Sequence, residues 1–124
     1  MNSNIIHLTG RVLLSLIFII AGFGKLTATA GTAGYMQAMG VPTVLLWPTI
    51  ALELLGGIAL LVGFQTKYVA WALAAFTLVA GAIFHNNFAD QMQSIMFMKN
   101  LAIAGGLLIL SVAANPFSLD SRKA

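Results

Sequence analysis

The stretch Leu8–Leu26, LTGRVLLSLIFIIAGFGKL, decides the fold of this 124-residue chain. It is long enough for one membrane-spanning helix, because a helix needs roughly 20 residues to cross a hydrocarbon core of about 30 Å. Three further apolar stretches follow it along the chain, separated by short connections. The sequence therefore predicts four transmembrane helices, at about residues 8–26, 44–64, 68–84 and 95–114.

The composition agrees with a membrane protein and excludes several functional classes. Hydrophobic residues make up 60% of the chain and charged residues 7%, against about 45–50% and about 25% in ordinary soluble domains. Because there is no cysteine, disulfides, thiolate metal sites and dithiol redox relays are excluded. The net charge of +3 is spread over the chain without a basic cluster, so nucleic-acid binding is not expected. Met92, Met96 and Met98 are interpreted as packing or interfacial residues, and no metal site is predicted.

The connections between the apolar stretches predict how the helices are arranged. Between the first two, Tyr35–Met39 is expected to form a short interfacial helix that ends at Gly40 and Pro42. Residues 65–67 are too few to do more than reverse the chain, so the flanking helices should be antiparallel. The predicted fold is all-α: an antiparallel four-transmembrane-helix bundle with one short interfacial helix, in a single domain of residues 1–124.

A secretory signal is an alternative interpretation of the first apolar stretch. Arg11, the apolar run 12–23 and the small residues 28–30 together imitate a signal peptide with its cleavage site. Lys25 falls in the would-be cleavage region, and no soluble domain follows that would need export. A permanent first span is therefore favoured.

Basic residues predict the orientation of the bundle. With an even number of spans, both termini share one side with the turn at residues 65–67, and cytoplasmic loops hold the excess of Lys and Arg. We therefore expect both termini to be cytoplasmic, in the inner membrane if the host is Gram-negative. Arg11 is interpreted as an orientation signal and headgroup contact, and His7 as an interfacial residue. The basic residues expected on the cytoplasmic side are Arg11, Lys67, Arg122 and Lys123, against Lys25 and Lys99 on the outer side.

Four ionisable side chains are expected at one level, near the outer side of the bundle. Each has small residues three or four positions away on its own helix, which is typical of faces where membrane helices approach closely. We expect the four to point toward one another and to line a polar pocket, closed by Asn86, Asn87 and the Tyr35–Met39 segment. One acid facing two lysines and a histidine leaves surplus positive charge, which an anionic or hydrogen-bond-accepting guest would satisfy. The candidate ligand-binding residues are Lys25, Glu53, His85 and Lys99.

A purely structural role for this cluster is the alternative. A carboxylate inside a span is costly, by about 2.5–3.5 kcal/mol at mid-helix on insertion scales. A lysine near a helix end could reach it and pair with it. Glu53 would then clamp two helices together without binding any guest.

The chain resembles the DoxX family of small four-helix membrane proteins. The resemblance covers nearly the whole chain, with its pieces in the right order and at the right spacing. The matching segments are RVLLSLIF (11–18), AGFGKL (21–26), YMQAMGVP (35–42), ELLGG (53–57), LVGFQTK (61–67), FHNNF (84–88), MFMKNL (96–101) and the glycine pair 105–106.

This resemblance implies a link to quinone chemistry. DoxX and the related DoxD are associated with quinone-linked oxidoreductases, as small membrane subunits of a terminal quinol oxidase and of thiosulfate:quinone oxidoreductase. Mycobacterial relatives are described as organising a membrane oxidoreductase complex. The recurring Arg, Lys, Glu and His positions of the family correspond to Arg11, Lys25, Glu53 and His85 here.

The leading hypothesis is an inner-membrane protein that binds a quinone-like or other amphiphilic small molecule, non-covalently, and serves an oxidoreductase system. Glu53 and His85 could move protons while Lys25 or Lys99 holds an oxygen. Because the chain lacks groups for electron transfer, oxidoreductase partner subunits are expected, and whether the chain itself is an enzyme is left open. The rival hypothesis is a non-enzymatic scaffold or assembly subunit whose polar cluster is a packing lock. Transport is a weaker third hypothesis, because four short helices leave little lumen and would need homo-oligomerisation.

Overall fold

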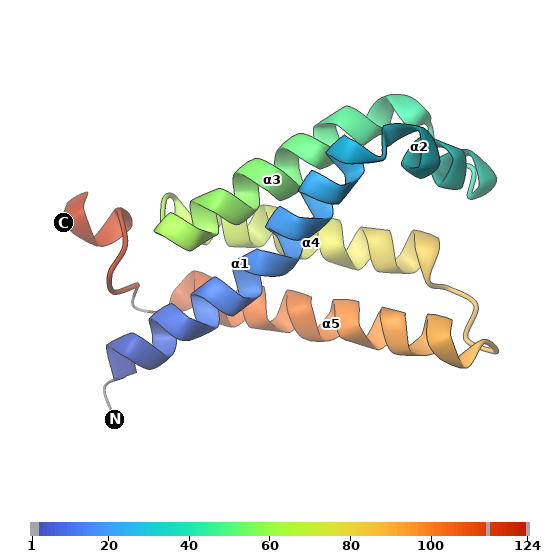
Figure 1. Cartoon of the computed structure of the whole chain (residues 1–124). Helices are drawn as coiled ribbons and strands as arrows, with labels where there is room; N and C mark the ends of the chain where they lie inside the picture. Colours follow the sequence, from blue (N-terminus) through green and yellow to red (C-terminus); the bar gives the residue numbers. More distant parts are fainter. Residues whose placement is uncertain (1–2, 114, 124) are drawn as a thin grey trace.

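The apolar stretches of the sequence form helices that run back and forth along the molecule. The structure is a computed structural model that describes residues 3–113 and 115–123. Within these residues, four helices are long and apolar enough to cross a membrane, and a short helix lies between the first two (Figure 1). The predicted all-α fold is thereby confirmed. The elements are α1 (Ser3–Thr27), α2 (Thr29–Ala38), the 3₁₀ turn η1 (Thr43–Leu45), α3 (Leu46–Val62), α4 (Thr66–Phe84), α5 (Gln91–Val112) and the 3₁₀ turn η2 (Asp120–Lys123).

Two of the spans begin about one turn before the predicted residue, because polar residues extend or cap their first turns. At the start of α5, the Asp90 carboxylate accepts a 3.0 Å hydrogen bond from the backbone N–H of Met92. This is the usual arrangement of a helix N-cap, and it adds a polar turn that hydrophobicity alone does not predict. α5 ends at Val112, and the predicted end at Ala114 lies outside the described residues.

Glycines determine how closely α1 and α3 approach each other. A Cβ atom at Gly22 would lie 2.9 Å from the backbone nitrogen of Leu54, and one at Gly57 would lie 2.8 Å from Cγ1 of Ile19. Both distances are too short for a real Cβ contact, so only glycine permits this approach. The expectation that small residues mark helix contacts is confirmed for this pair of spans.

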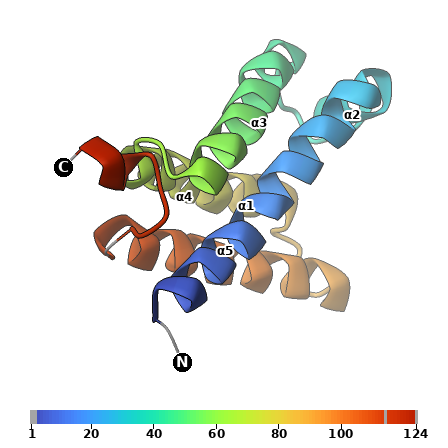
Figure 2. The same ribbon diagram turned by 60° about the vertical axis from the view of Figure 1, so that its left-hand side comes forward.

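The spans pack as two pairs. α1 packs along α3 and α4 along α5, and the contact of α3 with α4 joins the pairs. Leu60, Leu73 and Leu107 are fully buried where the pairs meet. α1 crosses α5 obliquely and touches it only over a short stretch (Figure 2).

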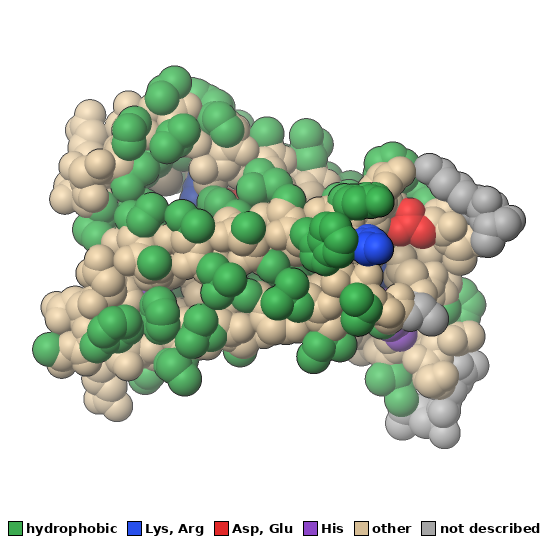
Figure 3. Space-filling model, turned by 180° about the vertical axis from the view of Figure 1, so that it is seen from behind, with side chains coloured by type: hydrophobic (Ala, Val, Ile, Leu, Met, Phe, Trp, Pro, Cys, Tyr) green, Lys and Arg blue, Asp and Glu red, His purple; other side chains and the backbone are tan. Residues whose placement is uncertain are grey.

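Large apolar side chains cover the outside of the bundle. Leu13, Leu55 and Ile109 are 64%, 66% and 71% exposed, and hydrophobic side chains are spread over the spans in the space-filling view (Figure 3). A protein surrounded by water rarely exposes so much contiguous apolar surface. Such exposed apolar side chains require a lipid environment.

The turn between α3 and α4 is a tight reversal, as predicted. Gly63 ends α3 with a φ of 74°, and the backbone N–H of Phe64 donates a 2.8 Å hydrogen bond to the carbonyl oxygen of Ala59. This left-handed glycine cap turns the chain back at once. Both termini lie at this end of the molecule, and α2 lies at the other end (Figure 1).

Candidate functional site

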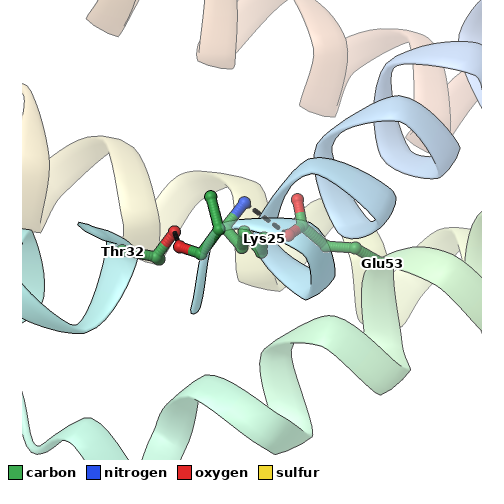
Figure 4. A network of polar contacts seen from close by, with 4 residues as sticks. Lys25, Thr32 and Glu53 are labelled. Atoms are coloured by element: carbon green, nitrogen blue, oxygen red, sulfur yellow. Dashed lines mark hydrogen bonds and ion pairs between the residues drawn. The ribbon is translucent and has the colours of Figure 1, made fainter. Parts of the chain in front are cut away.

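An ion pair joins α1 to α3 at the end of the bundle that carries α2. Lys25 lies in the last turn of α1 and Glu53 lies in α3, and the Lys25 Nζ atom is 2.6 Å from Oε1 of Glu53 (Figure 4). The close approach of the two helices at Gly22 brings these side chains within reach. Glu53 is 5% exposed, so its carboxylate depends on Lys25 for a partner. The predicted meeting of these two residues is confirmed.

The pair lies in the wall of a cavity of about 520 Å³ between the helices. This volume is within the range of about 300–1,000 Å³ that is typical of small-molecule sites. In the space-filling view, one basic and one acidic side chain are visible in a recess of the surface at the end away from the termini (Figure 3). Most of the lining is apolar. The side chains in the lining that can form hydrogen bonds are Lys25, Thr32, Tyr35, Thr49, Glu53, Thr77, His85 and Asn100.

His85 reaches the same cavity from the end of α4. It follows the last residue of the helix, and its backbone N–H donates a 2.9 Å hydrogen bond to the carbonyl oxygen of Gly81. Its Nδ1 atom lies 3.2 Å from Oε1 of Gln93. In the neutral tautomer in which Nδ1 donates to Gln93, the Nε2 atom is a proton acceptor. The expectation that His85 shares a pocket with Lys25 and Glu53 is therefore met.

Lys99 does not join this cluster, and the expectation that all four side chains converge is wrong for it. Lys99 is exposed and is not among the residues that line the cavity. One residue along a helix is a rotation of about 100°, and α5 turns Asn100 inward instead. Asn100 donates a 3.1 Å hydrogen bond from Nδ2 to the carbonyl oxygen of Thr77. The spacing of Asn100 with the buried Ala104 is the sequence signal that could have identified this face.

α2 covers the cavity from the side. The ring of Tyr35 stacks on that of Phe84, with centroids 5.2 Å apart, and Met36 packs with Leu46 and Ile50 in a small core of its own. The predicted closing role of the Tyr35–Met39 segment is supported by the presence of Tyr35 and Met36 in the lining.

Asn86 and Asn87, which were also expected to close the pocket, are exposed and do not line the cavity. They follow the end of α4, where the chain has already turned away toward α5.

Arg11 is buried inside the protein, which differs from the open interfacial position expected for it. It is 2% exposed, and it lies in the first half of α1, far along the helix from the cavity. Its Nη1 atom donates hydrogen bonds of 2.6 Å to Oδ1 of Asn115 and 2.9 Å to the carbonyl oxygen of Pro116. Its Nη2 atom donates a 2.7 Å hydrogen bond to the carbonyl oxygen of Phe117. Arg11 thus fastens the C-terminal segment to α1, a contact that no local pattern predicts.

Asp120 continues this network to the start of α4. Its Oδ1 atom accepts a 2.7 Å hydrogen bond from the N–H of Gln65, and its Oδ2 atom accepts a 2.9 Å hydrogen bond from the N–H of Thr66. Desolvation by itself would raise the pKa of Asp120. Hydrogen bonds from Thr66, Gln65 and Asn115 outweigh it and hold the pKa of this carboxyl below its usual value.

Across residues 3–113 and 115–123, no group of three or more His, Asp or Glu side chains comes together that could hold a metal ion.

Comparison with known proteins identifies the family. The DoxX family model matches residues 6–86. The chain is 48% identical to inner membrane protein YqjF of Escherichia coli (strain K12), over 91% of this chain and 88% of that protein. It is 34% identical to inner membrane protein YphA of the same strain, over 95% and 90% of the two chains.

A more distant relative is CatD of Bacillus subtilis (strain 168), whose name assigns it provisionally as an oxidoreductase. The identity is 27%, over 91% of this chain and 87% of that protein. No solved structure matches the chain. The extent of the family match and the similarity to YqjF together lead to one conclusion: this chain belongs to the DoxX family of membrane proteins.

Proposed function

We propose that this protein binds a quinone-like or similar amphiphilic small molecule in the cavity beside Lys25 and Glu53, as an accessory subunit of a membrane oxidoreductase system. It would lie in an inner membrane, as YqjF and YphA do by name, with both termini in the cytoplasm. The ion pair in the wall of an otherwise apolar cavity of about 520 Å³ is the observation that carries this proposal.

The lining suits a molecule with an apolar body and polar oxygen atoms. Lys25 is partly exposed, so its ammonium has donors left after pairing with Glu53. It could hold a carbonyl oxygen of the guest, and the amide of Asn100 lies in the wall on α5. The apolar lining would hold the body of the guest by excluding water from it.

Proton exchange is the chemistry that the polar residues could supply. A quinone supplies two-electron, two-proton redox chemistry when it is bound. Glu53 could accept or return one proton, with Lys25 stabilising its charged form, and Nε2 of His85 could accept another in the tautomer held by Gln93. Electrons would have to pass to a partner subunit when a quinol gives up its protons, or come from one when a quinone takes them up, because the sequence has no cysteine and two histidines only. The provisional oxidoreductase name of CatD agrees with such a setting.

Co-purification and binding test this proposal. The full chain is purified in mild detergent, its bound lipids are extracted for mass spectrometry, and decylubiquinone binding is measured by titration. Glu53→Gln and His85→Ala should lose most of the bound quinone, by about tenfold in affinity for a lost hydrogen bond to a charged group. Lys99→Gln is the matched control, because this side chain lies outside the cavity lining, and it should bind as the wild type does. Equal binding by all four proteins would overturn the proposal.

The packing-lock hypothesis is the second candidate, and the 2.6 Å pair between α1 and α3 is the observation that favours it. If the ion pair holds α1 to α3, removing it should lower the stability of the protein. If the pair serves ligand binding instead, an apolar replacement can be neutral or stabilising, as is often found for buried ion pairs. The variant Glu53→Leu therefore distinguishes the ligand-binding hypothesis from the packing-lock hypothesis. A melting temperature above that of the wild type, together with lost quinone binding, would assign Glu53 to ligand binding. A large loss of stability in a protein that never binds quinone would assign it to the lock.

A further inference from the structure

A second recess lies at the opposite end of the bundle from the cavity. It is a groove of about 490 Å³ between the first half of α1 and the end of α5, hereafter the α1–α5 groove. His7, Gly10 and Arg11 line it on α1, and Gly106 and Ile109 line it on α5. His7 and Lys25 are separated by about 27 Å along α1, at 1.5 Å per residue. The groove is therefore a different site from the one described above.

Missing side chains and diverging helices create the groove. α1 crosses α5 with limited contact, and both helices have a glycine where they separate. A Cβ atom at Gly10 would meet nothing within 4 Å, and one at Gly106 would meet only Leu14, at 3.8 Å. The space is many times that of one water molecule, which occupies about 30 Å³ in the liquid.

Unpartnered nitrogen atoms lie at one end of the groove. Both ring nitrogens of His7 and the Nε atom of Arg11 are buried without a hydrogen-bond partner among the described residues. His7 and Arg11 lie one turn apart on α1, and the N–H donors among these atoms, the Nε–H of Arg11 and a ring N–H of His7, indicate a missing acceptor. His7 is only partly buried as a residue, so rotation of its side chain can turn a ring nitrogen into the groove.

Charge indicates what this acceptor is. The partners of the Arg11 guanidinium are neutral oxygen atoms of Asn115, Pro116, Phe117 and Leu61, and no carboxylate lies within ion-pair distance of it in the described part of the chain. Asp120 acts on the Arg11 charge only from a longer distance, and both of its carboxylate oxygens are engaged by the start of α4. An anionic acceptor is therefore favoured over a neutral one.

We infer that the α1–α5 groove binds an anionic phospholipid, with the headgroup phosphate at His7 and Arg11 and an acyl chain along the apolar wall. The groove has a polar end at the first turns of a span and apolar walls deeper along both helices, which matches the shape of a lipid. Basic pockets between spans are known to bind anionic headgroups.

Native mass spectrometry of the full chain in detergent tests this inference. Phosphatidylglycerol and phosphatidylcholine with the same acyl chains are added separately, and the bound fraction is compared. The wild type should bind phosphatidylglycerol about fivefold or more tightly, as expected for one basic group near an anionic lipid. Gly106→Leu should fill the groove and reduce this binding by at least the same factor. Gly105→Leu is the matched control, because a Cβ atom there meets nothing within 4 Å and the residue does not line the groove.

His7→Phe tests the headgroup contact separately and guards against a folding defect in Gly106→Leu. It keeps the ring and removes both nitrogens, so phosphatidylglycerol binding should weaken and its preference over phosphatidylcholine should fall. Equal binding of the two lipids by the wild type, or equal effects of Gly106→Leu and Gly105→Leu, would overturn the inference. Displacement of the lipid by inorganic phosphate alone would assign the groove to a free anion instead. Decylubiquinone binding should be unaffected by all three variants.

Discussion

The Nη1 atom of Arg11 donates a 2.6 Å hydrogen bond to Oδ1 of Asn115, which joins the first span to the C-terminal segment. Asn115 in turn donates a 2.7 Å hydrogen bond from Nδ2 to Oγ1 of Thr66, at the start of α4. One buried arginine therefore holds together parts of the chain that are distant in sequence. Arg11 corresponds to a recurring arginine of the DoxX family. These hydrogen bonds give that arginine a structural role, and this role does not involve the cavity.

Arg11→Lys should loosen the C-terminal segment. Lysine keeps the charge but cannot donate to Asn115, Pro116 and Phe117 at once, because it lacks the planar fork of donors. These acceptors are part-buried, and each hydrogen bond lost from the charged guanidinium costs about 1.5–3 kcal/mol. Limited proteolysis should cut the variant between residues 113 and 121 faster than the wild type, and Lys99→Arg, at an exposed position, should be as resistant as the wild type. Equal resistance of Arg11→Lys would contradict the assigned role.

Asp120→Asn should remove one pH-dependent contribution to stability. The pKa of Asp120 is lower in the folded protein than in the unfolded chain, so the carboxylate stabilises the fold above its unfolded pKa of about 3.9. That stability is lost as the pH falls through the lower folded value. At neutral pH, the variant should be less stable by about 0.5–2 kcal/mol, as for other helix caps.

The measurement is thermal unfolding in detergent from pH 7 down to pH 3, with wild type and Asp120→Asn compared at each pH. The difference between them should shrink below about pH 4, because Asp120 takes up a proton in the unfolded wild-type chain before it does so in the folded protein. A difference that stays constant over this range would show that the carboxylate charge does not contribute.

Lys25→Met should destabilise the protein more than Glu53→Leu does. The lysine variant leaves a carboxylate unpaired at a position that is 5% exposed, and breaking a buried pair in this way costs about 3–5 kcal/mol. The glutamate variant leaves a lysine whose side chain is 29% exposed and can turn toward the membrane surface. The double variant should recover most of the loss in melting temperature. Strictly additive losses would mean that the pair is not coupled.

Gly57→Leu should separate α1 from α3. The new side chain would begin 2.8 Å from Cγ1 and 3.0 Å from the backbone nitrogen of Ile19, so the helices must move apart at a cost of about 1–3 kcal/mol or more. Gly24→Leu is the control, since a Cβ atom there meets nothing within 4 Å. Loss of the Lys25–Glu53 contact should accompany the first variant only, seen as reduced quinone binding. Similar melting temperatures for both variants would refute the role of glycine in this contact.

Single cysteines at Thr29 and Ala89 should report the orientation, because the natural chain has no cysteine. Thr29 begins α2 and Ala89 lies in the α4–α5 connection, both at the end of the molecule away from the termini. A membrane-impermeant maleimide added to intact spheroplasts should label both, while a cysteine at Lys67 should be labelled only after lysis. Labelling of Lys67→Cys alone in intact spheroplasts would reverse the predicted orientation.

The sequence by itself determined the four spans, their antiparallel order and the close contact of α1 with α3. The spans follow from the length of the apolar stretches, and the helix contact follows from glycines three or four residues from Lys25 and Glu53. Both are local properties of the sequence that directly favour spanning and close helix packing in lipid. The same local pattern predicted that Lys25, Glu53 and His85 lie at one pocket.

Only the tertiary structure decided which face of α5 turns inward and what Arg11 contacts. On α5, Lys99 and Asn100 are neighbours in sequence but about 100° apart around the helix, and the fit of Asn100 against Gly81 selects between them. The hydrogen-bond partners of Arg11 include residues in the segment after the last span, and no periodicity in the sequence predicts these contacts. Contacts between side chains distant in sequence depend on how whole helices pack. The residue pattern within one helix does not determine this packing.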